Sequence, residues 1–384
     1  MHQELLQQAA SHQQKMIDRI IAWSSIPSGS NFPDGLEIMK KTLIEAFSSL
    51  QAKLEEIPLE NNSGYALLFT KRPQAPVTIL LGGHYDTVYG NKIVSPHWTD
   101  NKILTGSGVA DMKGGLALML SALEIFESSP HADRLGWQIL INPDEETGSS
   151  GSAPLWEELA QMHRYGLLFE PSYPDGAWVD ERKGSINLRI YVQGRPAHAG
   201  RDFSQGRSAI VAIAHLITEI ENLNSLFEGI SVNVGTLEGG SAINIVADKA
   251  GCSVNIRSYE QIHIELATAK IQEMVAKASQ KEGIHVKMDI GSERPVKRMD
   301  AALEKLYALL KICAEELNLV YQTRASGGCC DGNNLAAAGL PVIDTLGVVG
   351  GKIHTPEEYL DVSSLVSRLQ CALLLMLKIS ENDI

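Results

Sequence analysis

Apolar runs of strand length alternate with helical patterns through the first half of the chain. The strand-like runs lie at residues 77–83, 137–142 and 167–169, and the helical patterns at about 114–127 and 155–163. An apolar run bounded by glycine or polar residues predicts a buried strand, and apolar positions every three or four residues predict a helix. The alternation returns between about residues 301 and 379, and it is typical of a mostly parallel sheet covered by helices.

A different pattern occupies the segment from about residue 183 to 295. It predicts a strand, a helix, two strands, a second helix and a last strand. These elements lie at 186–193, 208–223, 230–234, 250–256, 262–280 and 285–290. The order is typical of a self-contained α+β domain with its helices on one face. We therefore predict a discontinuous α/β domain, residues 1–182 and 296–384, interrupted by a smaller domain, residues 183–295.

Length and composition agree with two globular domains. The 384 residues exceed the roughly 250–300 at which a single core stops growing. The hydrophobic share of 44% and the charged share of 21% are ordinary for a globular protein. A net charge of −13 argues against a nucleic-acid partner, which needs a basic surface. No uninterrupted apolar run reaches the ~20 residues of a membrane span, so we expect no membrane partner.

The N-terminal segment and the cysteines favour the cytoplasm. Apolar positions from Leu5 to Ile21 recur near helical spacing and predict one amphipathic surface helix. The segment lacks the basic start and apolar core of a secretory signal. The five cysteines are odd in number and have no CxxC spacing, which favours reduced thiols. We therefore expect a cytoplasmic protein.

Histidines and carboxylates follow several of the predicted strands, where open α/β sheets place their sites. His84 and Asp86 come after the run at 77–83. Because they are two residues apart on an extended segment, both side chains point the same way. His84 is therefore a candidate metal ligand, and Asp86 a candidate to hold its ring. A capped histidine at a strand end is the better explanation of this pair when it is taken alone.

Four more motifs bring acids or a histidine to similar positions. Asp111 follows a glycine-rich turn before a helix, Glu145 and Glu146 follow a buried strand, Glu170 follows the next one, and His354 follows a glycine-rich loop. A helix cap would explain Asp111, and a hydrated turn would explain the consecutive acids. Acids beside buried strands are nevertheless costly unless something positive lies among them.

The five motifs in this order indicate a hydrolytic pair of metal ions. Carboxylates and imidazoles without thiolate spacing suit catalytic zinc better than structural zinc. The paired acids would also fit a glycoside hydrolase, but that chemistry leaves the two histidines unexplained.

With these motifs the chain, from about residue 15 to 380, resembles the superfamily of metallohydrolases that contains aminoacylases, carboxypeptidase G and succinyl-diaminopimelate desuccinylases. The resemblance implies that the discontinuous domain is a zinc-exopeptidase-like catalytic domain. It implies that the inserted domain is a ferredoxin-like lid and dimerisation domain, and hence that the protein is a homodimer.

The resemblance also implies two Zn²⁺ per subunit, with Co²⁺ as a substitute metal. His84, Asp111 and Glu170 would hold one ion, and Asp111, Glu146 and His354 the other. Each ion would keep an open position for a shared hydroxide. Glu145 would be the general base and Asp86 would orient His84. The Asp111–Met112 peptide bond would be cis.

In the inserted domain, the segment Gly194–Gly200 resembles the motif whose histidine serves the partner subunit. His198 would then stabilise the oxyanion of the tetrahedral intermediate. Asn244 and Arg257 match the carboxypeptidase G spacing for substrate contacts, and Arg257 would bind the substrate carboxylate. A histidine in a turn and an arginine at the surface are the structural alternatives for these residues.

One loop departs from the pattern. Gly328 and Cys329 lie in the loop that borders the substrate in the superfamily, and Cys329 stands where carboxypeptidase G has glycine. A preference for glutamate therefore does not follow from the resemblance.

The resemblance implies a hydrolase that cleaves an amide bond next to a free carboxylate in a small-molecule substrate, in the manner of a glutamate carboxypeptidase. An N-acyl-amino-acid deacylase, such as acetylornithine deacetylase, is the alternative within the superfamily. A catalytically inactive binding homologue is the alternative outside catalysis, and it would lack a ligand or Glu145, which this chain retains.

Overall fold

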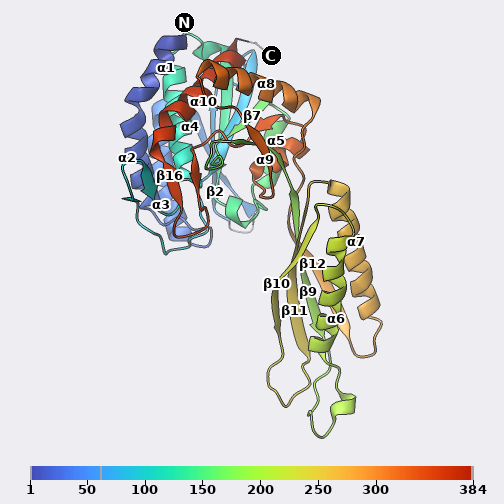
Figure 1. Cartoon of the computed structure of the whole chain (residues 1–384). Coiled ribbons are helices and arrows are strands. Elements are labelled where there is room, and N and C mark those ends of the chain that lie inside the picture. The colour runs from blue at the N-terminus through green and yellow to red at the C-terminus, as the bar shows by residue number, and fades with distance from the viewer. Residues whose placement is uncertain (1, 61–62, 382–384) are drawn as a thin grey trace. The chain divides into compact units, whose positions relative to one another are not determined.

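The computed structural model describes residues 2–60 and 63–381 (Figure 1). The chain divides into two compact units. The large unit comprises Met1–Glu181, Arg298–Ser326 and Cys330–Ile384, and the inserted unit comprises Arg182–Lys297 and Gly327–Cys329. The short loop Gly327–Cys329 therefore belongs with the inserted unit, although both segments that flank it belong to the large one.

A six-stranded sheet forms the centre of the large unit, in the order β1-β2-β6-β3-β7-β14. Its strands are β1 (Lys53–Pro58), β2 (Tyr65–Lys71), β3 (Val77–His84), β6 (Leu135–Asn142), β7 (Tyr165–Leu168) and β14 (Val342–Ile343). The four strands from β6 to β14 are parallel, β2 pairs antiparallel with β6, and β1 pairs antiparallel with β2. The mostly parallel, helix-covered sheet that the sequence predicts is thus confirmed, with an antiparallel edge added.

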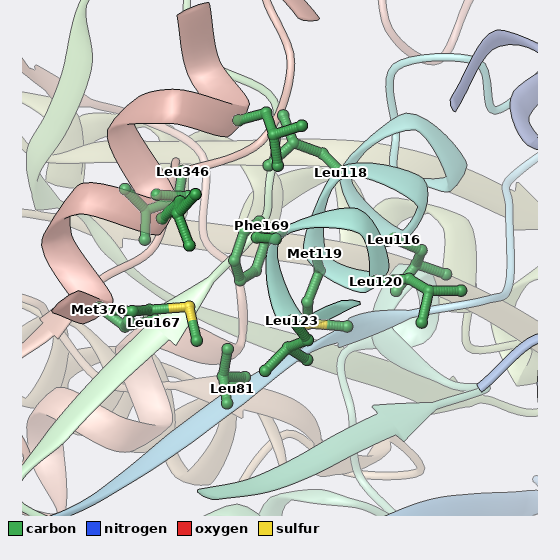
Figure 2. Close-up of a cluster of buried hydrophobic side chains, with 14 of the residues drawn as sticks. Leu81, Leu116, Leu118, Met119, Leu120, Leu123, Leu167, Phe169, Leu346 and Met376 are labelled. Atoms are coloured by element: carbon green, nitrogen blue, oxygen red, sulfur yellow. The ribbon is translucent and has the colours of Figure 1, made fainter. Parts of the chain in front are cut away.

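Helices cover both faces of this sheet. They are α1 (His2–Ser11), α2 (Gln13–Ser24), α3 (Pro33–Phe47), α4 (Lys113–Glu127), α5 (Ala153–Ala160), α8 (Ala301–Glu316), α9 (Asp331–Ala337) and α10 (Leu365–Ser380). Alternate residues of β3 enter different cores: Leu81 packs with α4 and α10, and Leu80 packs with α5 and α9. Figure 2 shows Leu81 in the first core, close to Leu123 of α4 and Met376 of α10. This two-sided burial explains why β3 reads as a continuous apolar run.

Two helices differ from what the sequence suggests. The single N-terminal helix is in fact two, α1 and α2, separated at His12, and both bury apolar residues against α4. The segment Val362–Ser380, which includes α10, is long and apolar enough to span a membrane by composition alone, but most of it is buried inside the unit. Packing of α10 against α4 and α8 explains its apolar character.

Two smaller sheets complete the large unit. One has the order β15-β16-β5-β4, and the other pairs β13 with β8. The strands are β4 (His97–Trp98), β5 (Ile103–Thr105), β8 (Trp178–Arg182), β13 (Thr323–Ser326), β15 (Gly350–Gly351) and β16 (Tyr359–Asp361). The connection between β15 and β16 contains His354.

The inserted unit is one antiparallel sheet in the order β10-β11-β9-β12, with two helices on one face (Figure 1). Its elements are β9 (Gly184–Gln193), α6 (Ala209–Glu221), β10 (Ser231–Gly239), β11 (Lys249–Ser258), α7 (Gln261–Ala278) and β12 (His285–Arg294). This βαββαβ order is the ferredoxin-like arrangement. Strand β9 alternates between buried and exposed residues, because only the face under the helices is covered.

Candidate metal centre

Strand register brings four of the candidate side chains to one edge of the large sheet. His84 ends β3 and pairs with Asn142, which ends the neighbouring parallel strand β6. Glu145 and Glu146 follow Asn142 in a short 3-10 turn, and Glu170 follows β7 on the other side of β3. Because carboxyl ends of parallel strands meet at one edge, residues far apart in the sequence become neighbours.

The first triplet consists of His84, Asp111 and Glu170, and all three are buried. The His84 Nε2 atom lies 3.2 Å from Asp111 Oδ1 and 3.8 Å from Glu170 Oε1. Donor atoms around a tetrahedral zinc with bonds of about 2.0–2.1 Å lie about 3.3 Å apart. The separations in this triplet are therefore close to those of a shared ion.

The second triplet consists of Asp111, Glu146 and His354. The His354 Nε2 atom lies 3.3 Å from Asp111 Oδ2 and 3.1 Å from Glu146 Oε2. The two oxygens of Asp111 thus face different histidines, as a carboxylate that bridges two ions must. His354 adopts a φ of 64°, a left-handed conformation that is uncommon outside glycine and frequent at functional sites.

Asp86 links the first triplet to the acidic turn. Its Oδ1 lies 3.3 Å from His84 Nδ1, and its two oxygens accept the backbone amides of Glu145 and Glu146 at 3.2 and 3.1 Å. The Ser30 hydroxyl donates a further hydrogen bond at 2.7 Å. One buried carboxylate therefore fixes the ring of His84 and the start of the turn that carries Glu145 and Glu146.

A second buried carboxylate, Glu358, shapes the turn before α4. It accepts the backbone amides of Gly108, Ala110 and Asp111 at 2.9–3.0 Å, and the Tyr89 hydroxyl at 2.7 Å. The Asp111–Met112 bond that ends this turn is cis, as the resemblance implies.

The close approach of α4 to the end of β7 explains the glycine at position 115. A Cβ added to Gly115 would lie 1.9 Å from the carbonyl oxygen of Phe169, the residue before Glu170. Only glycine therefore lets the start of α4 lie against the end of β7, which brings Asp111 and Glu170 together.

The charges of the site perturb one another strongly. Hydrogen bonds that the His354 ring donates to Asp111 and Glu146 raise its pKa to about 11. Burial and the Asp111 charge raise the pKa of Glu146 to about 7. Burial alone would lower the pKa of His84, but hydrogen bonds to Asp111, Asp86 and Glu170 raise it well above its usual value. Both histidines therefore hold protons in the metal-free protein, which a bound metal must displace.

The other candidates lie on the inserted unit. His198 is exposed, and its Nδ1 accepts the backbone amides of Gly200 and Arg201 at 3.1 and 3.2 Å. Asn244 is exposed beside it, since its carbonyl accepts the amide of Ala199 at 3.0 Å.

Arg257 lies near the loop Gly327–Cys329 in the same unit. Its Nε donates to Asn255 at 2.9 Å, and its Nη1 donates to the Gly327 carbonyl at 3.0 Å and lies 4.0 Å from Cys329 Sγ. The next carbonyl, that of Gly328, accepts a hydrogen bond from Arg182 at 3.1 Å. The expected substrate contacts on this unit therefore form two groups, one around His198 and Asn244 and one around Arg257.

The family of the chain can now be stated. Residues 80–378, more than half of the sequence, match the model of peptidase family M20/M25/M40. The chain belongs to this family. It is therefore a metal-dependent hydrolase of the metallopeptidase and amidohydrolase type.

Individual relatives within the M20/M25/M40 family are distant. The chain is 28% identical to carboxypeptidase G2 from Pseudomonas sp. (strain RS-16) over 302 residues, 77% of this chain and 72% of that one. It is 26% identical to a succinyl-diaminopimelate desuccinylase from Psychrobacter arcticus over 395 residues, 93% of each. The expected superfamily is thus confirmed.

Solved structures show the same fold. A tripeptidase from Staphylococcus aureus gives a TM-score of 0.79 at 24% identity, over 96% of this chain and 99% of that one. An M20 family metallo-carboxypeptidase from Sulfolobus solfataricus gives 0.77 at 15% identity, over 95% and 99%.

Three residues that support the site in this M20/M25/M40 chain have no role in the sequence-based predictions. Ser30 donates to Asp86, Glu358 accepts amides of the turn before Asp111, and Tyr89 donates to Glu358, but none of the three directly follows a predicted strand of the main sheet. The only signal for Glu358 is its place four residues after His354, and sequence does not reveal that Glu358 is buried while Glu357 is exposed.

Proposed function

We propose that the two triplets hold a pair of zinc ions and that the protein hydrolyses an amide bond next to a free carboxylate. His84, Asp111 and Glu170 would bind one ion, and Asp111, Glu146 and His354 the other. The observation that carries this proposal is the position of Asp111 between the two histidines, with one oxygen 3.2 Å from His84 and the other 3.3 Å from His354. Nitrogen and oxygen donors without thiolates fit catalytic zinc.

When bound, the ions would supply Lewis acidity, which lowers the pKa of water and polarises a carbonyl. The side chains divide the remaining work. Glu145 takes a proton from the attacking water and returns it to the leaving amine, so that no charge builds up on either group. Asp86 keeps the His84 ring and the Glu145 amide in fixed positions, so that the base needs little reorganisation before it acts.

Arg257 is our candidate for recognising the substrate carboxylate. Its Nε and Nη1 are engaged within the inserted unit, while Nη2 makes no hydrogen bond to any described residue. A guanidinium positioned by two such contacts loses little freedom when it binds a carboxylate. Asn244, Gly328 and Cys329 are the further candidates for substrate contact.

We further propose a homodimer in which His198 serves the partner subunit. With Nδ1 accepting two amides, the neutral ring carries its proton on Nε2, which is the donor that an oxyanion requires. The inserted unit also exposes large apolar side chains, with exposed fractions of 69% for Phe203, 61% for Leu237 and 105% for Ile243. Exposed apolar groups of this kind are typical of surfaces that a partner covers.

The experiment is a hydrolysis screen with Zn²⁺ or Co²⁺ added. We expect turnover of dipeptides with C-terminal glutamate or a related residue. Turnover confined to N-acyl amino acids such as acetylornithine would instead identify a deacylase, which the match to the desuccinylase over 93% of both chains favours as second candidate. Failure to hydrolyse either class with two ions bound would contradict the proposed reaction. The five free cysteines fit a reducing cytoplasm.

A further inference from the structure

A second type of metal site is formed by residues far from the catalytic triplets. We propose that His2, His131 and Glu381 bind one divalent cation of the zinc type and thereby join the two ends of the large unit. Their candidate ligand atoms all lie within 4.8 Å of one another. His2 opens α1, His131 precedes the 3-10 turn Ala132–Arg134, and Glu381 caps the end of α10.

The separations fit a single ion. The Glu381 Oε1 atom lies 3.1 Å from His2 Nε2 and 3.6 Å from His131 Nδ1. These values lie on either side of the ~3.3 Å expected between donors around a tetrahedral zinc. The two rings meet edge to face, with centroids 5.7 Å apart, so both can direct a nitrogen toward the same carboxylate.

His131 provides the second, independent observation. It is 6% exposed, and both its ring nitrogens are buried without a hydrogen-bond partner among the described residues. A buried imidazole without a partner loses its hydration without compensation, which disfavours folding. Coordination by Nδ1 would compensate for that loss, whereas the 3.6 Å contact to Glu381 is too long to be a hydrogen bond.

The ligand set is typical of zinc and not of calcium or magnesium. Two imidazoles with one carboxylate select zinc and similar transition metals, while calcium and magnesium prefer oxygen donors. Three protein ligands leave a fourth position for water, but no general base or substrate-binding group is part of this cluster. The site is therefore structural.

Its position suggests what it stabilises. Helix α1 packs against α4 and α10, and Gln370 of α10 donates a hydrogen bond to the Leu6 carbonyl at 2.9 Å. Terminal helices open easily unless they are tied down. An ion shared by His2, His131 and Glu381 would tie α1 to the end of α10, and it would be present only when both helices are in place.

The first experiment counts metal ions. Untagged protein is stripped with a chelator, titrated with Zn²⁺ and analysed by calorimetry and by elemental analysis after gel filtration. We expect one ion fewer per chain in His131→Gln and in Glu381→Gln than in the unaltered chain, with hydrolysis unchanged. His215→Gln, which alters an exposed histidine outside the three candidate clusters, is the matched control and should retain the full number.

Equal metal content in the unaltered chain, His131→Gln and Glu381→Gln would overturn the proposal, and the 3.1 Å contact between His2 and Glu381 would then be only a hydrogen bond. Should His131→Gln fail to fold, Glu381→Gln decides, because Glu381 is only partly buried. The difference between variants does not depend on how many ions the catalytic triplets hold. It therefore remains interpretable even if the proposed function fails.

The second experiment locates the ion. Amide hydrogen exchange in α1 is measured with free Zn²⁺ at about ten times its Kd. If α1 binds the ion only when it is closed, exchange that requires opening of α1 should slow about tenfold. We expect this slowing in the unaltered chain and in His215→Gln, but not in His131→Gln. Slowing confined to segments around His84 and His354 would contradict a site at the chain ends.

Discussion

Glu145 and Glu146 leave the end of β6 in one short turn, and the carboxylate of Asp86 accepts both of their amides. The carboxylate of Glu146 lies 3.1 Å from His354 Nε2, within the second triplet. Glu145 belongs to neither triplet. Two adjacent acids of the same type can therefore serve different purposes, because only Glu146 belongs to one of the triplets.

The first prediction separates these two acids. Glu145→Gln should keep its metal ions and lose turnover by at least about 10²-fold, the lower end of the range for general acid–base catalysis. Glu146→Gln should bind one ion more weakly, because an amide is a poorer ligand than a carboxylate. Metal content and kcat are measured on both variants, and identical metal content would refute this division of roles.

A second prediction concerns the pH dependence of metal binding. The pKa of His354 in the metal-free chain is about 11, so a proton occupies this ligand throughout the neutral range. A metal must displace it, and its apparent affinity should rise at least about tenfold per pH unit from pH 6 to 8. The slope should be steeper below pH 7, where Glu146 also binds a proton. Calorimetry at three pH values measures this, and a pH-independent affinity would disprove it.

Arg257 allows a third test at this scale. Arg257→Ala should raise KM for substrates with a free α-carboxylate and leave an esterified analogue largely unaffected, because only the free form offers a bidentate charged partner. Steady-state kinetics on the two substrates would decide the point. An equal effect on both would indicate that Arg257 only supports the loop at Gly327–Cys329.

At the scale of elements, the turn before α4 depends on a side chain from the β15–β16 segment. Glu358 accepts hydrogen bonds from three backbone amides of this turn, and it is fully buried. Pairing between β16 and β5 fixes the position of Glu358, because the next residue, Tyr359, pairs with Thr105. The position of Asp111 is therefore set by an element more than 240 residues later in the chain.

Glu358→Ala tests this arrangement. Removing the carboxylate leaves buried amides without an acceptor, so the free energy of unfolding should fall by at least about 1–3 kcal/mol, with weaker metal binding as a second effect. The adjacent Glu357→Ala is the matched control, because Glu357 is exposed and its carboxylate forms a surface ion pair with Lys352. Its urea midpoint should stay close to that of the unaltered chain. Similar urea midpoints for both variants would contradict the role of Glu358.

The elements that sequence predicted well are those buried on both sides or strongly periodic. Strands β3 and β6 and helices α4 and α7 lie within a few residues of the predicted ranges. The edge strand β1 and its neighbour β2 were not predicted, and the mostly exposed pattern of β1 carries no clear period. The break at His12 was missed for another reason: apolar spacing continues across it, and tertiary contacts decide where the helix turns.

Site residues were also easier to predict where they lie beside strands that are buried on both sides. Residues directly after buried strands, such as His84 and Glu170, were recognisable because strand ends mark the edge where ligands gather. The supporting contacts of Ser30 and Tyr89 were not, because they depend on loops whose paths sequence does not specify. The assignment of roles to individual ligands stays a prediction.

At the scale of the whole molecule, the proposed dimer leads to a prediction that does not follow from contacts within one subunit. Glu145→Gln and His198→Ala, each inactive alone, are mixed and allowed to exchange subunits. In a mixed dimer, one site would keep its own Glu145 and receive His198 of the partner subunit. Random pairing gives half mixed dimers, so roughly a quarter of all sites should recover. Absence of recovery after verified exchange would mean that His198 acts within its own chain.

The discontinuous large unit also imposes an order on biosynthesis. His84, Asp111 and Glu170 all leave the ribosome before the inserted unit does, whereas His354 follows it. At about 5–20 residues per second, the roughly 180 residues between Glu170 and His354 take on the order of 10–40 s to translate. Strand β14, which pairs with β7, is also made after the insertion. A nascent chain thus carries the complete first triplet, together with Asp111 and Glu146, well before His354 completes the second triplet.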